Sequence, residues 1–295
     1  MPARVIAVTG GKGGVGKSTT TVNLGVSLRM DGHSVALIDA DVEMPNLVEL
    51  LGIEPPVTIH DVLSGTAETE QALIEIGEGF AAIPGDPSIS GYASIEPAHL
   101  ETVVGTLEEA YDFVLLDTGA GLSYDDIMPL GLADEIVLVS SPDAAAVENA
   151  KRTQAFVERL NRPIGGVVIT KADGSVDGSI AEEFDTELLA VVPDDQAVRL
   201  STAAGKPLEV YSPNSPAAQA YRQLEANLTD GVLPPQQADQ SATQQSETVV
   251  EAAGRDQTES EDASDAPDED EPEADEASDR PDPGLLARFV RRVTP

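Results

Sequence analysis

A glycine-rich segment at residues 11–18 constrains the fold of this chain more than any other feature. Its sequence, Gly-Lys-Gly-Gly-Val-Gly-Lys-Ser, matches the phosphate-binding pattern G-x-x-x-x-G-K-[ST]. An apolar, β-branched run at residues 4–9 predicts a buried strand before it, and residues 18–28 have the apolar spacing of a helix. In this context, backbone N–H groups and the helix N-terminus bind phosphate. The segment therefore predicts a nucleotide site.

The residues of this segment have defined expected roles. Lys17 is expected to reach the β- and γ-phosphates, and the Ser18 hydroxyl to hold Mg²⁺. Phosphate binding does not require Lys12, whose simplest interpretation is a solvated loop residue. The expected nucleotide contacts are Gly11, Lys12, Gly13, Gly14, Val15, Gly16, Lys17, Ser18 and Thr19.

Short apolar runs recur between helical stretches in residues 1–230. Each run is continuous rather than alternating, which is typical of strands buried on both faces of a parallel sheet. We therefore expect one α/β domain with a doubly wound, mostly parallel sheet of about seven strands, and a ligand beyond their carboxyl ends. The predicted strands are residues 4–9, 34–39, 80–84, 112–117, 135–140, 165–170 and 188–192.

Three aspartates follow predicted strands and complete the expected site. Asp117 closes the run Phe-Val-Leu-Leu-Asp, where an aspartate at a strand tip orders Mg²⁺. Gly119 and Gly121 follow it, and their backbone N–H groups can approach the γ-phosphate, although such a run is also a good turn. Asp39 and Asp41 follow the second predicted strand, where a polar cap to the next loop is the alternative interpretation.

The composition changes after residue 230. Residues 231–283 are rich in Asp, Glu, Gln, Ser, Ala and Pro, and their few apolar side chains cannot offset the entropy of ordering, so they predict a disordered acidic linker. Residues 284–295 contain three arginines and no acid, and at 100° per residue their apolar and basic faces separate. They predict a basic amphipathic helix with the candidate membrane-binding residues Leu285, Leu286, Arg288, Phe289, Val290, Arg291, Arg292 and Val293.

The net charge of the chain is -36, and the excess is not confined to the tail. Residues 233–295 carry 17 acidic and 5 basic side chains, which leaves a net charge of -24 for residues 1–232. Such an acidic domain argues against sequence-independent DNA binding and is typical of a high-salt cytoplasm. The chain has no cysteine, which excludes disulfides, cysteine zinc sites and iron–sulfur ligation. No export signal opens the sequence and no apolar run approaches about 20 residues, so we expect a cytoplasmic protein.

The pattern Lys-Gly-Gly-x-Gly-Lys-[Ser/Thr], together with Asp39-Ala40-Asp41 and the following Asn46-Leu47, resembles the deviant phosphate-loop ATPases of the MinD/ParA superfamily. The resemblance is closest to the MinD family and, with the acidic composition, implies a halophilic archaeal source. It implies that Lys12 reaches the nucleotide of a facing subunit, so that ATP holds a homodimer together. It also implies that Asp41 orients the attacking water and that Asp39 lies in the outer Mg²⁺ shell. The implied catalytic residues are Lys12, Lys17 and Asp41, and the implied metal residues are Ser18, Asp39 and Asp117.

The resemblance also implies which residues contact the adenine base of the nucleotide. Pro193 and Asp194 lie in a segment that is similar to the family's adenine-binding segment, and Lys171 is a further candidate contact. Two positions depart from the family's pattern. Thr170-Lys171 stands where an Asn-Arg pair is frequent, and Gly119 stands where MinD usually has proline.

The resemblance implies a Mg²⁺-dependent ATPase that positions division machinery or another polar assembly. Its terminal helix would bind the inner face of the cell membrane peripherally, and an unknown activating or cargo protein would stimulate it. Two alternatives stay open. One is a ParA-like partitioning regulator, although DNA binding is disfavoured by the charge. The other is a soluble positioning ATPase whose tail recruits a protein partner.

Overall fold

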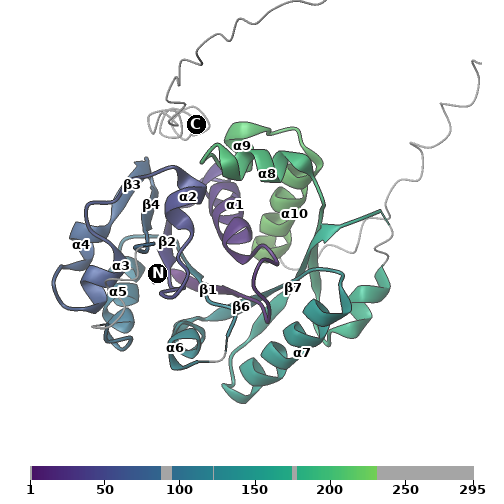
Figure 1. The fold of residues 1–295 in the computed structure, drawn as a ribbon, viewed down its shortest axis with the longest axis horizontal. Helices are drawn as coiled ribbons and strands as arrows, with labels where there is room; N and C mark the ends of the chain where they lie inside the picture. The colour runs from purple at the N-terminus through teal and green to yellow at the C-terminus, as the bar shows by residue number, and fades with distance from the viewer. Residues whose placement is uncertain (1, 88–94, 122, 175–177, 231–295) are drawn as a thin grey trace, which may run out of the picture. The chain divides into compact units, whose positions relative to one another are not determined.

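The computed structural model of this chain describes residues 2–87, 95–121, 123–174 and 178–230 (Figure 1). The predicted acidic linker at 231–283 and the predicted helix at 284–295 lie outside these residues and stay predictions. No helix within the described residues is long and apolar enough to cross a bilayer.

Strands and helices are interspersed along the described chain, with consecutive helices after β2 and after β8. The strands are β1 (Arg4–Thr9), β2 (Val35–Asp39), β3 (Ile74–Gly77), β4 (Phe80–Ile83), β5 (Phe113–Asp117), β6 (Glu135–Ser140), β7 (Ile164–Ala172) and β8 (Leu188–Pro193). The α-helices are α1 (Lys17–Met30), α2 (Leu47–Leu51), α3 (Ile59–Leu63), α4 (Thr69–Ala72), α5 (His99–Glu108), α6 (Tyr124–Leu132), α7 (Ala144–Arg159), α8 (Gln196–Ala203), α9 (Leu208–Tyr211) and α10 (Pro216–Asp230). A 3₁₀ helix, η2, spans Gly178–Glu183.

These strands form one eight-stranded sheet in the order β3-β4-β2-β5-β1-β6-β7-β8. All neighbouring pairs are parallel except β3 and β4. The register pairs Asp39 of β2 with Asp117 of β5, and Asp117 with Val8 of β1. The carboxyl ends of these three strands therefore finish side by side, at the point where the glycine-rich segment leaves β1.

The predicted doubly wound α/β fold is confirmed, with one strand more than the seven expected. The additional strand, β3, is antiparallel to β4, and its pairing is irregular between Glu75 and Gly77. Ile74 and Glu75 are partly or fully exposed, so this edge strand lacks the continuous apolar run by which the other strands were predicted.

Each face of the sheet has its own apolar core, because successive side chains of a strand point to opposite faces. Ile6 and Val8 pack on the face that α1, α2, α9 and α10 cover (Figure 1). Val5 and Ala7 pack on the face that α3, α5 and α6 cover, with most of the buried apolar residues of α7. Helix α1, which follows the phosphate loop, therefore packs in one of the two cores, and helices cover both faces of the sheet.

Gly25 brings α1 close to the sheet. A Cβ atom at Gly25 would lie 2.8 Å from Cδ2 of Leu37 and 3.2 Å from Cε2 of Phe80. Cβ atoms essentially never approach another heavy atom within 3.0 Å, so any side chain here would force α1 or its neighbours to move. Gly25 therefore helps to set the distance between α1 and the sheet.

Gly25 and Gly105, both within α-helices, give opposite predictions. We expect Gly25→Ala to lower the free energy of unfolding by up to about 2 kcal/mol, because overpacking costs up to about 3 kcal/mol and the helix gain returns about 1 kcal/mol. Gly105→Ala in α5 is the matched control: no atom lies within 4 Å of its Cβ position, so about 0.5–1 kcal/mol of helix gain remains. Urea denaturation measures both, and equal stabilisation by the two substitutions would contradict the packing argument.

Candidate functional site

The glycine-rich segment turns tightly between β1 and α1. Gly14 and Gly16 have φ values of 76° and 94°, in the left-handed region that favours glycine. Gly11 is needed for space, because a Cβ atom there would lie 2.3 Å from the backbone of Asn149 in α7. The loop therefore keeps its backbone N–H groups near the N-terminus of α1, where phosphate binds most favourably. Lys17 opens α1 and is only 6% exposed.

Two side chains at the end of β7 hold this loop in place. The buried Thr170 hydroxyl donates to the backbone oxygens of Val15 and Ser140. The Lys171 ammonium donates to the backbone oxygen of Gly14, and Lys171 itself has a φ of 54°. The pair that departs from the family pattern thus contacts the phosphate loop. Lys171 stays a predicted nucleotide contact, and its observed partner is the loop backbone.

Asp39 and Asp117 are both fully buried at the ends of adjacent strands. One oxygen of each has partners: Oδ2 of Asp39 accepts from the backbone N–H groups of Asn46 and Leu47, both at 3.0 Å, and Oδ1 of Asp117 accepts from the Thr21 hydroxyl at 3.2 Å. The other oxygen of each, Oδ1 of Asp39 and Oδ2 of Asp117, is buried without a hydrogen-bond partner. An unpaired buried carboxylate oxygen is costly, so both have unused capacity for a cation or a donor.

Burial dominates the electrostatics of this pair. Loss of solvation raises the pKa of Asp117 to about 7, against the lowering effects of the Ser18 hydroxyl and the charge of Lys17. Burial also raises the pKa of Asp39 well above its usual range, and the nearby Asp117 charge adds to this. The two carboxyl groups are therefore a high-energy pair until positive charge joins them.

These oxygens have the chemistry that Mg²⁺ prefers. Mg²⁺ takes oxygen ligands and is usually held by one or two carboxylates together with substrate phosphates. Within the described ranges, no three acidic, histidine or cysteine side chains form a ready metal cluster, so the protein alone offers an incomplete shell. The predicted metal residues Ser18, Asp39 and Asp117 lie at the same end of the sheet and suit a nucleotide-bound Mg²⁺.

Asp41 lies on the loop that follows β2, which we call the first switch (residues 40–46). Its Oδ1 accepts from the backbone N–H of Met44 at 3.0 Å. Partial burial raises the pKa of Asp41, and the nearby Lys17 charge counteracts this. Asp41 therefore lies within electrostatic reach of the lysine that is expected to bind phosphate, and its role with water stays a prediction.

The second switch, which consists of Thr118–Gly121 and Ser123, follows β5. Its two glycines contact Asp126 of α6, whose Oδ2 accepts from the backbone N–H of Ser123 at 3.0 Å and from its hydroxyl at 2.7 Å. The predicted contact Gly121 thus lies on a loop braced by the helix that follows it.

Lys12 forms an ion pair within its own subunit. Its Nζ lies 2.9 Å from Oδ1 of Asp143, the residue that caps the N-terminus of α7. Hydrogen bonds from the Ser141 hydroxyl, Lys12 and the Ala146 N–H lower the pKa of Asp143 to about 2. The side chains are 43% and 49% exposed, so this pair contributes at most about 1 kcal/mol. Lys12 is therefore held loosely at the surface.

An open cleft of about 540 Å³ lies beside the loop. Its volume is within the range of about 300–1,000 Å³ that is typical of small-molecule sites. It is lined by Lys12, Gly13, Gly14, Val15, Ser141, Pro142, Asp143, Lys171 and Asp173. The cleft thus joins the phosphate loop to the end of β7.

The predicted base contacts lie at this same end. Pro193 pairs with Ala172 in the sheet, and the backbone N–H of Asp194 donates to the oxygen of Ala172 at 2.9 Å. The Asp194 carboxylate forms an ion pair with Arg199 at 2.6 Å. The structure thus brings Lys171, Pro193 and Asp194 together at the ends of β7 and β8, and their contact with a base stays a prediction.

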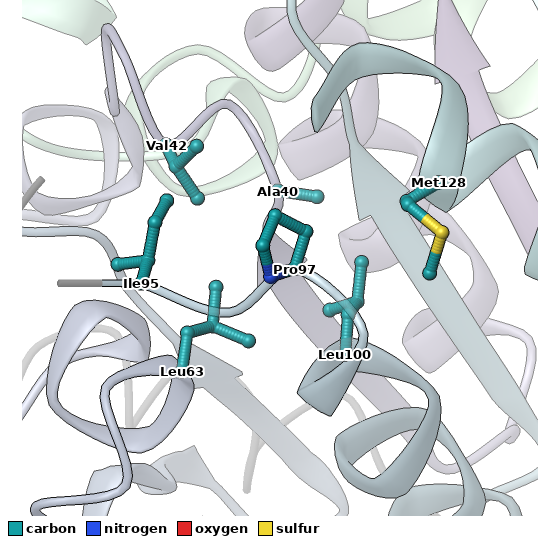
Figure 2. A pocket seen from close by; sticks show the side chains of 7 residues that line it. All are labelled: Ala40, Val42, Leu63, Ile95, Pro97, Leu100 and Met128. Atoms are coloured by element: carbon teal, nitrogen blue, oxygen red, sulfur yellow. The ribbon is translucent and has the colours of Figure 1, made fainter. Parts of the chain in front are cut away.

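A small apolar pocket lies between the first switch and α6 (Figure 2). Ala40 and Val42 flank Asp41 on the first switch, and Met128 lies on α6, two residues after Asp126. Its volume of about 10 Å³ would hold roughly one water, and its lining gives a water few partners. The other lining residues are Leu63, Ile95, Pro97 and Leu100. The pocket shows that the first switch and α6 pack against the same apolar side chains.

The site also contains residues that were not predicted from the sequence, among them Thr21, Asp126 and Asp143. Asp143 follows β6 in the run Ser-Ser-Pro-Asp, and the rule that ligands bind beyond the carboxyl ends of strands could have indicated it. Thr21 lies one helical turn after Lys17, so helical spacing could have placed it on the same face. Asp126 gives no such signal, because only the folded loop brings it to the two glycines.

A protein-family comparison identifies the fold as one of known type. The family model ParA, described as an NUBPL iron-transfer P-loop NTPase, matches residues 2–229. The complete chain has no cysteine and therefore no thiolate for iron–sulfur ligation.

Individual relatives agree with this match. An uncharacterized ATP-binding protein of Methanocaldococcus jannaschii is 34% identical over 233 residues, which cover 77% of this chain and 88% of the relative. The septum site-determining protein MinD of Pyrococcus horikoshii, solved with Mg-ADP, has 31% identity and a TM-score of 0.73 over 77% of this chain and 96% of that one. A MinC:MinD cell division complex of Aquifex aeolicus has 27% identity and a TM-score of 0.71, over 80% and 99% of the two chains.

The pKa of Asp117 gives a prediction for the protein without nucleotide or Mg²⁺. The folded carboxyl group keeps its proton up to about pH 7, whereas the unfolded one releases it near pH 4, so stability should fall as the pH rises between these values. Asp117→Asn removes this loss, and we expect it to raise the free energy of unfolding at pH 8 by a few kcal/mol, on the order of 1.4 kcal/mol per pKa unit. Urea denaturation from pH 4 to pH 8 measures the effect.

Asp112 is the control for this prediction. It precedes the same strand, and hydrogen bonds from the Ser34 backbone and side chain lower its pKa. Asp112→Asn should therefore give no gain at pH 8. An Asp117→Asn protein that is less stable than the wild type at pH 8 would refute the argument from burial.

Proposed function

This chain belongs to the ParA/MinD family of P-loop ATPases, and from that membership we propose that it is an ATP-driven positioning switch. It binds MgATP, forms a homodimer with the nucleotide between the subunits, and returns to the monomer after hydrolysis. The observation that carries the proposal is the arrangement around Lys17. Lys17 is buried at a helix N-terminus, and its charge acts on the buried carboxylate of Asp117. Asp117 is paired with Asp39 in the sheet, and each of these two carboxylates has a buried oxygen without a hydrogen-bond partner.

The site residues divide the chemistry of phosphoryl transfer among them. Lys17 and the loop N–H groups would bind the β- and γ-phosphates, which concentrates positive charge where the transition state is negative. Ser18, Asp39 and Asp117 would hold Mg²⁺, which would supply positive charge to neutralise the phosphates. Asp41 would orient the attacking water. Phosphoryl transfer depends mainly on such positioning, so one well-placed carboxylate suffices.

Lys12 links the nucleotide state to assembly. In this structure its ammonium group is occupied by Asp143 of the same subunit. A half-exposed ion pair is weak, so Lys12 can leave Asp143 at little cost and reach the phosphates of a facing subunit. The same lysine would then contribute to hydrolysis and to dimerisation.

The output of the switch would be spatial positioning. Solved relatives are cell division proteins, one of them in complex with MinC, and this supports division machinery or another polar assembly as the cargo. Residues 284–295 would bring the dimer to the inner face of the cell membrane. Two weak helices on one dimer act together through their effective concentration, and this would make membrane binding depend on ATP.

Three alanine variants separate the steps of the proposed cycle. Lys17→Ala should weaken ATP binding by on the order of 100-fold, because it removes a buried charge contact. Lys12→Ala should still bind ATP but stay monomeric, and Asp41→Ala should bind ATP and stay dimeric because hydrolysis is blocked. Calorimetry measures binding, and light scattering in high salt measures mass. A monomeric Asp41→Ala protein at saturating ATP would overturn the dimer cycle.

Flotation with anionic liposomes tests the membrane step. We expect the full chain to float at least about 10-fold more with ATP than with ADP, because only the dimer presents two helices. A chain that ends at Pro283 is the control and should not float with either nucleotide. Equal flotation of the two chains would reject a membrane role for residues 284–295. ATP-independent flotation of the full chain alone would reject the coupling to dimerisation.

A further inference from the structure

The contact between Asp126 and the second switch carries a further inference, which rests on the proposed ATP hydrolysis. We propose that Asp126 is a positioning residue of the hydrolytic site: its carboxylate, seated against Gly119 and Gly121, sets the conformation of the second switch beside Asp41. Asp126 is not among the residues assigned above to the binding of phosphate, base or metal.

One carboxylate occupies the space of two missing side chains. A Cβ atom at Gly119 would lie 2.0 Å from Oδ1 of Asp126, and a Cβ atom at Gly121 would lie 2.2 Å from Oδ2. Neither glycine has a positive φ, so the backbone conformation would accept other residues. A side chain at either glycine would therefore have to displace the Asp126 carboxylate.

Asp126 is itself fixed by the start of α6. Oδ2 accepts from the Ser123 N–H and hydroxyl, and the Ser123 hydroxyl accepts from the Asp126 N–H at 3.3 Å. This reciprocal pair is a capping box, which satisfies N–H groups that a helix N-terminus leaves unpaired. The carboxylate therefore cannot shift without disturbing the first turn of α6, and the loop takes its position from the helix.

The contact between Asp126 and the second switch lies directly beside Asp41, the residue that is expected to orient water. The same Cβ position at Gly119 that is 2.0 Å from Asp126 is 3.5 Å from Oδ1 of Asp41. The carboxylates of Asp126 and Asp41 thus both lie against Gly119. In addition, Met128 of α6 and the neighbours of Asp41 line one apolar pocket (Figure 2). α6 therefore supports both switches, and a displaced Asp126 moves Gly119 relative to Asp41.

This arrangement predicts an effect on kcat and not on KM. In the proposed function the glycine-rich segment and the ends of β7 and β8 would bind the phosphates and the base, and the contacts of Asp126 described above are with other segments. Misplacement of a reacting group by about 1 Å can cost about 100-fold in rate. Asp126→Ala should therefore lower kcat by on the order of 10- to 100-fold while KM for ATP stays within about 2-fold. Asp126→Asn keeps the shape and an acceptor oxygen, so it should retain most of kcat.

A double-substitution cycle in the full-length chain distinguishes bracing from general damage. Gly119→Ala alone should lower kcat at least as much as Asp126→Ala, because its Cβ pushes the carboxylate away. In Gly119→Ala/Asp126→Ala the new Cβ has space, so kcat should equal that of Asp126→Ala within about 2-fold and not the product of the two losses. Gly131→Ala on the same helix is the control, because no atom lies within 4 Å of its Cβ position and kcat should not change.

Each outcome of this experiment decides between hypotheses. Losses that multiply in the double variant, or an unchanged kcat in Asp126→Ala, would overturn the positioning role. If Asp126→Ala does not fold, as circular dichroism and ATP binding would show, the decision passes to Asp126→Asn, whose kcat must stay near that of the wild type. A wild-type chain that binds ATP and does not hydrolyse it would reject the proposed function itself and not the brace alone.

Discussion

The site depends on two buried carboxylates that the parallel register places at the ends of neighbouring strands. Asp39 and Asp117 are paired residues of β2 and β5, so their proximity is a property of the sheet. A change of one residue in register would turn one of them toward the opposite face. The pair is held at high free energy by burial, and the nearby Lys17 charge offsets part of that cost for Asp117. The fold thus holds two poorly solvated carboxyl groups together, and a cation bound with a phosphate chain can stabilise them.

Close packing of backbone segments surrounds this pair. Gly11 lies against α7, Gly85 against Pro45 of the first switch, and Gly25 against the sheet, and each position leaves no space for a Cβ atom. Thr170 and Lys171 then bind carbonyl oxygens of the phosphate loop, so β7 holds the loop from outside. The loop therefore has little freedom before a nucleotide arrives, and little ordering entropy remains to oppose binding.

Local patterns made much of this predictable. The strands, the glycine-rich segment and the aspartates that close β2 and β5 are short runs whose meaning depends on adjacent residues. The edge strand β3 was missed because its half-exposed residues break the apolar run. Asp126 and Asp143 were missed for a different reason: each acts on a segment that is near only after folding. Gly119 was noted as a departure from the family's proline, but the departure is understandable only with Asp126 in view, since the carboxylate occupies the space that a ring would need.

The ion pair of Lys12 with Asp143 has a consequence for any assembly that uses this lysine. A lysine without an ion-pair partner in its own subunit would gain the full electrostatic attraction to a new partner. Lys12 starts on a carboxylate whose low pKa keeps it charged at any physiological pH. Its transfer to a second subunit would therefore be an exchange of anions, and the loss of the half-exposed pair with Asp143 would subtract at most about 1 kcal/mol from the gain at the new partner. Ionic strength would weaken this half-exposed pair more than a pair that an interface buries, so added salt would favour the release of Lys12 from Asp143.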